Sequence, residues 1–345
     1  MATNFPGSLD SFPSDFTLAS HTLGTDPHST LHGNLGDSVA ALEVKVGVTN
    51  SAVTTSLDYR VNKPGLVQGR LTLTSGTPVT TGDVTGATTL YFTPYKGSAI
   101  ALYGNSTWTQ YNFSEISVSL SGLVYTANPP SVPATQANLK CADIFAYWNG
   151  SAVALEILNW TDGGNRATAL VLQDGVRVKS GDSTRLYLGT VAPSAAGTSE
   201  DSISKRLVYN YYNRIQKKML VLEAAASWVY NTNTLRPSNN NTNNRLQVAP
   251  GVQEDTTILF GFSISSSDTI NRITSIGLDS TSAASDDFNK HAYYYPGYDY
   301  GLAYLNQATA IGYHYYQLLE AGPGSGSTTW YGSSLDTAIS GLYFC

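Results

Sequence analysis

Apolar residues near the beginning of the chain recur at helical spacing. They follow one another at intervals of 4, 4, 3 and 4 residues, which places all five on one narrow stripe of a helix. The five residues of this stripe are Leu31, Leu35, Val39, Leu42 and Val46.

Start and stop signals flank this stripe. Asp26 can cap free N–H groups, Pro27 suits a first helical position, and Gly47 is a typical helix end. A helix of about 20 residues with so narrow a stripe is marginal in water by itself. We therefore expect it to be buried against copies of itself in a short parallel bundle; the alternative is that it packs on the chain's own β region.

Short segments separated by Gly- and Asn-based turns dominate the rest of the chain. Long helix-forming runs are scarce, and β-branched and aromatic residues are abundant. This pattern predicts a mainly β fold, with the arm and helix followed by two β-sandwich or jelly-roll-like domains. Strands are expected at 57–61, 70–74, 88–92, 99–103, 108–111, 116–119, 143–148, 152–157, 170–174, 185–191, 219–223, 227–230, 257–264, 270–278, 303–320 and 327–331.

Changes in this pattern divide the chain into four parts. We expect an arm and helix over 1–62, a first β domain over 68–192, a connector over 193–216 and a distal β domain over 217–345. Within the connector, 193–199 is expected to be a polar loop and 202–215 a short helix or an irregular segment. Within the distal domain, the Asn-rich stretch 237–245 is predicted to be an exposed loop. The Gly-rich stretch 322–327 is predicted to be a hairpin loop.

Charge narrows the range of partners. Charged residues make up 13% of the chain, the net charge is −6, and the 19 Lys and Arg residues are scattered along the chain. No basic stripe is available to neutralise phosphates, so nucleic acid is not an expected partner. A polar surface of hydroxyl and amide groups suits an extracellular or particle-borne protein.

The sequence shows none of the patterns typical of a disulfide framework, a signal peptide or a membrane span. The two cysteines, Cys141 and Cys345, imply no disulfide framework. The first residues lack the pattern of a signal peptide, and no apolar run reaches the length of a membrane span. We expect synthesis in the cytoplasm without membrane insertion, and stability from packing and assembly.

The first 24 residues are rich in Pro, Ser, Thr and Gly and carry isolated aromatic residues. This composition is typical of an extended arm. Phe12 and Phe16 would then need a groove on a partner to be buried, which makes them candidates for attachment to a larger assembly.

A metal site and a glycosidase site are both conceivable. His28 and His32, four apart on the predicted helix, could bind an ion near a trimer axis, but hydrogen bonds to neighbouring chains are the favoured interpretation. The adjacent acids at 254–255 and 286–287 could supply two carboxylates, but neighbouring acids on a loop usually point apart. We predict no catalytic residues, no metal and no cofactor.

Tyrosines are concentrated near the end of the chain. A tyrosine offers a flat apolar face with a hydroxyl tip, which suits recognition of a glycan or protein as well as packing between subunits. Packing at an interface is the favoured interpretation, and the later stretch Tyr313–Leu319 looks like core. The receptor or interface candidates are Tyr293, Tyr294, Tyr295, Tyr298 and Tyr300.

Three stretches carry a resemblance to a known family. HTLGTDPHSTLHGNLGDSVAALEVKVGV, followed by SLDYRV, resembles an N-terminal attachment module of tail-fibre and related appendage proteins of tailed bacteriophages. RLTLTSGTPVTTGDVTGATTLYFTPYKGSAIALYGNSTW and ALVLQDGVRVKSGDSTRLYLGTV resemble a β domain that accompanies this module. IGYHYYQLLEAGPGSGSTTWYG is similar to the end of such proteins.

The resemblance implies a non-enzymatic virion protein. It would be a homotrimeric tail fibre, attached through its N-terminus to a tail or neck adaptor and involved in host adsorption or in linking to other fibre proteins. A capsid decoration or head- or neck-fibre protein is the first alternative, and a polysaccharide-degrading tailspike is the second. The attachment positions that the resemblance implies are Asp26, Pro27, His28, Leu31, His32, Leu35, Leu42, Glu43 and Gly47. Phe12, Phe16, Val39 and Val46 are further attachment candidates from the sequence pattern.

Overall fold

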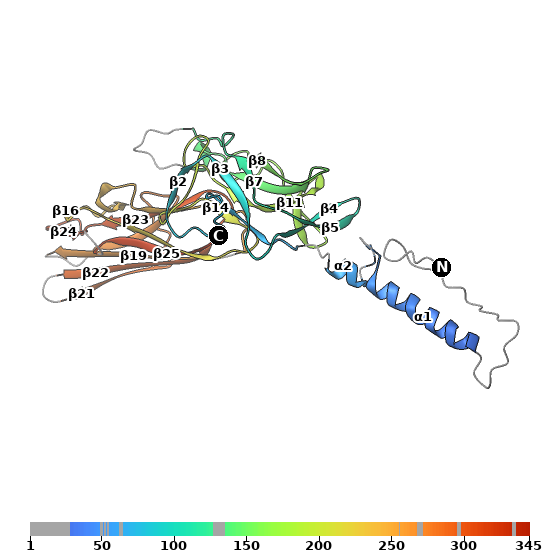
Figure 1. Cartoon of the computed structure of the whole chain (residues 1–345). Coiled ribbons are helices and arrows are strands. Elements are labelled where there is room, and N and C mark those ends of the chain that lie inside the picture. Colours follow the sequence, from blue (N-terminus) through green and yellow to red (C-terminus); the bar gives the residue numbers. More distant parts are fainter. Residues whose placement is uncertain are drawn as a thin grey trace.

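The computed structural model describes residues 28–48, 51, 53, 55–61, 65–126, 135–254, 256–267, 272–294, 298–332 and 336–345. Side chains are not described at 28–32, 34, 60, 61, 256, 267 and 290–294. Strands account for 50% of the described residues and helices for 8%, so the mainly β prediction is confirmed. Figure 1 shows helix α1 (His28–Val46) extending away from the β region at one end of the molecule, with the strands of residues 288–308 at the opposite end.

Helix α1 ends as the sequence predicts, while Asp26 and Pro27 of its predicted start lie outside the described residues. Gly47 closes it with a φ of +86°, and its N–H donates to the carbonyl of Glu43 at 2.7 Å. The predicted strand at 57–61 is wrong, because this segment is helix α2 (Leu57–Val61). Ser56 caps this turn by accepting the N–H of Tyr59 at 3.2 Å, and Asp58 lies in the first turn.

The first β region contains three sheets and the 3₁₀ turn η1 (Gln136–Asn138). One sheet has the order β1-β3-β6, formed by Gly69–Thr72, Thr89–Pro94 and Ile116–Ser119. The hairpin β4-β5 consists of Ala99–Gly104 and Thr107–Asn112. The third sheet has the order β8-β7-β11-β10-β9 with β14 beside β11: Val153–Asn159, Ala142–Trp148, Asp182–Val191, Val176–Lys179, Leu170–Gln173 and Val208–Asn210.

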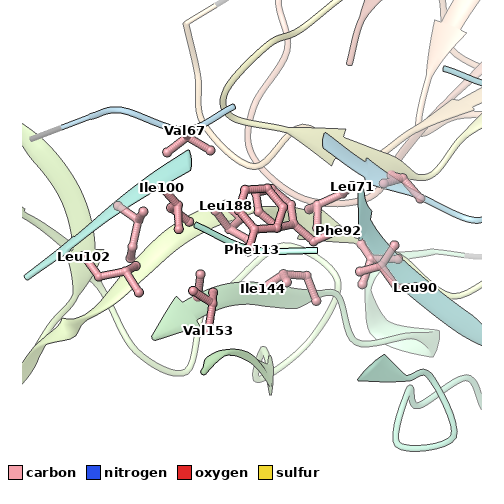
Figure 2. Close-up of a cluster of buried hydrophobic side chains, with 14 of the residues drawn as sticks. Val67, Leu71, Leu90, Phe92, Ile100, Leu102, Phe113, Ile144, Val153 and Leu188 are labelled. Atoms are coloured by element: carbon pink, nitrogen blue, oxygen red, sulfur yellow. The ribbon is translucent and has the colours of Figure 1, made fainter. Parts of the chain in front are cut away.

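Apolar side chains from these three sheets share one core. Figure 2 shows Phe92 and Phe113 beside Leu188 in this core, and the two phenylalanine rings stack with their centroids 4.7 Å apart. Ile100 of the hairpin and Ile144 of the large sheet are both fully buried in the same cluster. The hairpin is therefore held to the larger sheets by side-chain packing.

Two larger sheets make up the second β region. The central sheet has the order β17-β23-β18-β13-β12-β2 with β20 beside β23: Arg236–Pro237, His314–Ala321, Arg245–Val248, Lys205–Arg206, Ser199–Asp201, Val84–Ala87 and Ile273–Leu278. The tyrosine sheet has the order β15-β25-β19-β22-β21, with β24 beside β19 and β16 beside β24: Gln216–Leu222, Ala338–Phe344, Thr256–Ser267, Tyr298–Ala308, Phe288–Tyr294, Thr328–Tyr331 and Ser227–Val229.

The inner faces of these two sheets pack on each other. Leu259 and Leu305 of the tyrosine sheet lie in one buried cluster with Ile276 and Leu318 of the central sheet. This packing buries one face of the tyrosine sheet, and the opposite face points outward.

The central sheet also joins the two β regions. Its strand β2 comes from the first region, and β13 pairs in parallel with β18, with Arg206 opposite Val248. Arg70 of β1 donates to the carbonyl of Cys345 at 3.0 Å, which ties the end of the chain to the first region. The boundaries predicted at 192/193 and 216/217 stay a prediction.

Several local predictions differ from the structure. The segment 202–215 contains strands β13 and β14 and no helix. The run 303–320 is two strands, β22 and β23, because the chain turns between them at Gly312, whose φ is +106°. The stretch 322–327 is no hairpin, because it leads from β23 in the central sheet to β24 in the tyrosine sheet.

Candidate functional site

The apolar stripe of α1 is largely uncovered. Leu35 is 62% exposed and Leu42 is 60% exposed, while Val39 and Val46 are half-buried. In Figure 1 the helix extends away from the β region. Leu35 and Leu42 therefore do not pack on the chain's own β region, which was the alternative expectation for this stripe.

Much of the predicted attachment segment lies outside the described residues. This holds for Phe12, Phe16, Asp26 and Pro27, and for the side chains of the first helical turn. Among the predicted attachment residues, these are the side chains of His28, Leu31 and His32. Ion binding by the two histidines therefore stays a prediction.

The predicted tyrosine run falls into two groups. Tyr298 and Tyr300 lie on β22 with side chains turned outward, 45% and 37% exposed. Tyr293 and Tyr294 belong to β21, where Tyr294 pairs with Tyr298, and Tyr295 lies outside the described residues. The later stretch 313–319 is buried throughout, which confirms that it is core.

Tyr298 and Tyr300 are part of a larger apolar surface that sequence reasoning missed. We define the outer face as the outward side chains of the tyrosine sheet. It includes Leu220, Leu222, Val229, Ile258, Phe260, Phe262, Ile264, Phe288, Tyr298, Tyr300, Leu302, Tyr304, Tyr331, Leu342 and Phe344, with Lys218 as the one charged group among its described side chains.

Aromatic contacts make the outer face continuous across neighbouring strands. Tyr304 lies between Phe260 and Phe288, with ring centroids 5.3 and 5.6 Å away. The Phe262 and Tyr300 rings stack at 6.0 Å. A shallow hollow of about 250 Å³ is lined by apolar groups that include Ile258, Phe260 and Leu342.

A cleft of about 480 Å³ opens beside the β4-β5 hairpin. Trp148 at the end of β7 is 38% exposed and stacks on Tyr111 of β5, with ring centroids 4.2 Å apart. The rest of the lining offers aromatic, amide and hydroxyl groups: Tyr103, Asn105, Thr107, Thr109 and Thr184. An exposed ring beside hydroxyl and amide groups has the chemistry of a saccharide contact.

A buried ion pair lies where the two β regions meet. Arg166 Nε donates to Asp143 Oδ2 at 2.7 Å, and the Thr190 hydroxyl donates to Asp143 Oδ1 at 2.7 Å. Arg166 also donates to the carbonyl of Gly251. Burial raises the pKa of Asp143, and the Arg166 charge only partly offsets this.

The Asn-rich stretch 237–245 is no exposed loop, because Ser238 and Asn244 are buried. Asn244 Nδ2 donates to Glu223 Oε2 at 2.5 Å and to the carbonyl of Ser238 at 3.0 Å. The turn η2 (Ser238–Asn240) lies in this stretch. Its amides satisfy a buried carboxylate, which explains why a polar stretch can be covered.

Glu223 and Glu320 belong to the same buried cluster as Asn244, but their pKa values are shifted in opposite directions. Burial raises the pKa of Glu320, although Trp228 and Arg236 contact it. Burial acts on Glu223 too, but hydrogen bonds from Ala225 and Asn244 lower its pKa overall. Glu320 is only 1% exposed, so it would have to be uncovered before it could meet a substrate.

The acidic pairs singled out from the sequence have structural partners. Glu254 accepts from Arg177 at 3.1 Å and from Arg214, while Asp255 lies outside the described residues. Asp286 accepts the N–H of Ile276, and Asp287 accepts the N–H of Asn306 at 2.6 Å. These bonds hold loops to strands.

Within the described residues, no group of three or more His, Cys, Asp or Glu side chains is placed to hold a metal ion. No described helix has the length and apolar character needed to cross a membrane. No family model, curated protein or solved structure matches the chain.

Proposed function

We propose that this chain is a non-enzymatic structural protein of a tailed-bacteriophage particle, a subunit of a trimeric tail fibre. The observation that carries the proposal is helix α1, which extends from the β region with Leu35 and Leu42 uncovered. Exposed leucines on one stripe require a partner, and three parallel copies would supply it. The resemblance of residues 21–61 to a phage attachment module supports the same assignment.

In this proposal the two ends of the chain have different tasks. The arm and α1 dock on a tail or neck adaptor of the virion, with Phe12 and Phe16 in grooves of that partner. The two β regions, arranged as sandwich or jelly-roll-like domains, reach the host surface or hold a second fibre protein. The separation of α1 from the tyrosine sheet in Figure 1 supports this division.

Substitutions in α1 test the trimer. We expect Leu35→Asp and Leu42→Asp to abolish assembly in sedimentation velocity, because a buried carboxylate without a partner costs several kcal/mol. Val44→Asp is the matched control, since Val44 is 53% exposed and lies off the stripe. If both leucine variants stay trimeric, α1 does not hold the subunits together.

Particle imaging separates the tail fibre from the decoration alternative, because density for this chain on the capsid lattice would contradict the tail assignment. The tailspike alternative is tested with purified protein and host surface polysaccharide. We expect no sustained release of reducing ends. Release that a single Asp or Glu substitution abolishes would overturn the non-enzymatic assignment.

A further inference from the structure

We propose that the outer face of the tyrosine sheet is an interface between copies of this chain, in addition to α1. This inference rests on the trimer of the proposed function and names a surface that the helix alone does not supply. The occupant is a second copy of the same sheet region.

Side chains along β19 form two rows, one on the inward and one on the outward face of the tyrosine sheet. Leu259 is the large apolar residue of the inward row, but from residue 261 onward that row is Gly261, Ser263 and Ser265. The outward row carries Ile258 and Phe260, and then Phe262 and Ile264 opposite this small and polar part. A two-layer β protein that works as a monomer places its larger apolar residues inward and polar residues outward. In this part of β19 the order is reversed, as expected for a strand that contributes to two buried layers.

Strand β22 repeats the reversal beside it. Between residues 299 and 303 its inward residues Asp299, Gly301 and Ala303 are small or charged and its outward residues Tyr300 and Leu302 are large, while Leu305 further along is a large inward residue. Register pairs Ile264 with Tyr300 and Phe262 with Leu302, so the outward rows of the two strands form one surface. The apolar character thus belongs to the sheet and not to a single strand.

The uncovered area is large enough for a stable interface. Ten side chains of the outer face are between 36% and 60% exposed: Leu222, Val229, Ile258, Phe260, Phe288, Tyr298, Tyr300, Leu302, Leu342 and Phe344. With roughly 150–200 Å² for each free side chain, they leave roughly 630–840 Å² uncovered. About 800 Å² per partner is the size of a standard protein interface, and large for an apolar patch on a monomer.

Charge points to a second copy as the occupant. Lys218 is the one charged side chain described on the outer face, and Lys290 holds a register position opposite Leu302 at its edge. A face this poor in charge matches itself without an oppositely charged partner. In Figure 1, β19 and β22 run along the long direction of the molecule, so copies packed on this face lie side by side as a fibre requires.

Acidic substitutions in the full chain test this interface. We compare the double variant Phe260→Asp, Leu342→Asp with Leu172→Asp, whose leucine is 64% exposed on β9 of the first region. Sedimentation velocity over a range of concentrations should show at least a 100-fold weaker association for the double variant and a change within threefold for the control. Circular dichroism checks that both variants are folded.

A milder change covers the case in which the double variant does not fold. Ser340→Cys places a thiol opposite Phe260 on the outer face, while Ser151→Cys places one on an exposed turn; the native Cys141 and Cys345 are buried. We expect alkylation of Cys at 340 to slow at least tenfold as the protein assembles, and alkylation at 151 to stay constant.

The outcomes separate this inference from the proposed function. A trimeric wild-type chain whose assembly is unaffected by the double variant, with equal alkylation at both sites, overturns the interface but leaves the α1 trimer standing. A wild-type chain that stays monomeric at micromolar concentration overturns both. Loss of binding to another virion protein without loss of self-association assigns the face to that protein and also overturns the inference.

Discussion

Where the two β regions meet, Arg166 donates hydrogen bonds to both carboxylate oxygens of Asp143 through two of its guanidinium nitrogens. Arg166 Nε and Nη2 lie 2.7 and 3.2 Å from the carboxylate oxygens, and the guanidinium covers the Trp160 ring at 4.4 Å. The same guanidinium donates to the carbonyl of Gly251. Through the bond to Gly251, Arg166 joins the first β region to the region that carries the outer face.

Removal of this arginine should destabilise the whole chain. We expect Arg166→Met to lower the free energy of unfolding by about 3–5 kcal/mol, because the Asp143 carboxyl group stays buried without its charged partner. The matched control is Arg177→Met, whose partly exposed pair with Glu254 should contribute at most about 1 kcal/mol. Urea unfolding at pH 7 measures both, and equal losses would contradict the account.

The Arg166→Met variant should also respond to pH. Burial already raises the pKa of Asp143, and loss of the Arg166 charge should raise it further. The folded state then keeps a proton that the unfolded state releases above about pH 4, so the free energy of unfolding falls as pH rises. We expect the loss relative to wild type to grow between pH 4 and pH 7. A loss independent of pH would show that Asp143 is not the group involved.

Asp201 should give the opposite pH dependence. Burial alone would raise its pKa, but Lys217 and Arg206 outweigh burial and hold the pKa below its usual value. Its stabilisation is present above about pH 4 and lost as the pH falls through the folded-state pKa. Asp201→Asn should cost about 3 kcal/mol at pH 7, and its difference from wild type should shrink near pH 2. Asp37→Asn on α1 is the exposed control; a constant difference for Asp201→Asn would contradict the assignment.

The Asn-rich stretch offers a matched pair of substitutions. Asn244→Ala removes donors to Glu223 and to the carbonyl of Ser238, and should cost about 1–3 kcal/mol because a buried carboxylate oxygen loses a partner. Asn243→Ala changes an exposed neighbour and should stay within about 0.5 kcal/mol. Thermal unfolding of the two variants distinguishes a buried cluster from an exposed loop, which would give equal values.

The cleft beside Trp148 yields a prediction about host adsorption. If the chain contacts a surface glycan there, Trp148→Ala should weaken binding of purified protein to host polysaccharide at least tenfold, because each stacking contact supplies about 1–2 kcal/mol. Leu172→Ala, at an exposed apolar position away from the cleft, should have no effect. Unchanged binding by Trp148→Ala would remove the cleft from the adsorption surface.

The sequence pattern predicted an element correctly where neighbouring residues alone determine its structure. Helix α1 follows from its spacing and from Gly47, and β6 was predicted at its observed bounds because Ile116 and Val118 alternate with serines. The turn that splits 303–320 could not be predicted in the same way. Gly312 packs against the backbone of Gly163, a contact that leaves no trace in the neighbouring residues.

The missed parts of the candidate site depend on distant residues. Burial of Asn244 requires Glu223, which lies on another segment, so composition alone predicted an exposed loop. The outer face did leave a signal in β19, where Phe260 and Phe262 alternate with Gly261 and Ser263. That alternation shows which residues share a face, but not which face is covered by the central sheet.

The proposed function places this chain in a phage particle, and electron cryomicroscopy of purified phage particles tests this central claim most directly. We predict three copies around one axis on the tail, with α1 of each copy bundled at the particle and the outer faces turned toward one another. Single copies on the capsid lattice, or purified particles without this chain, would contradict the account.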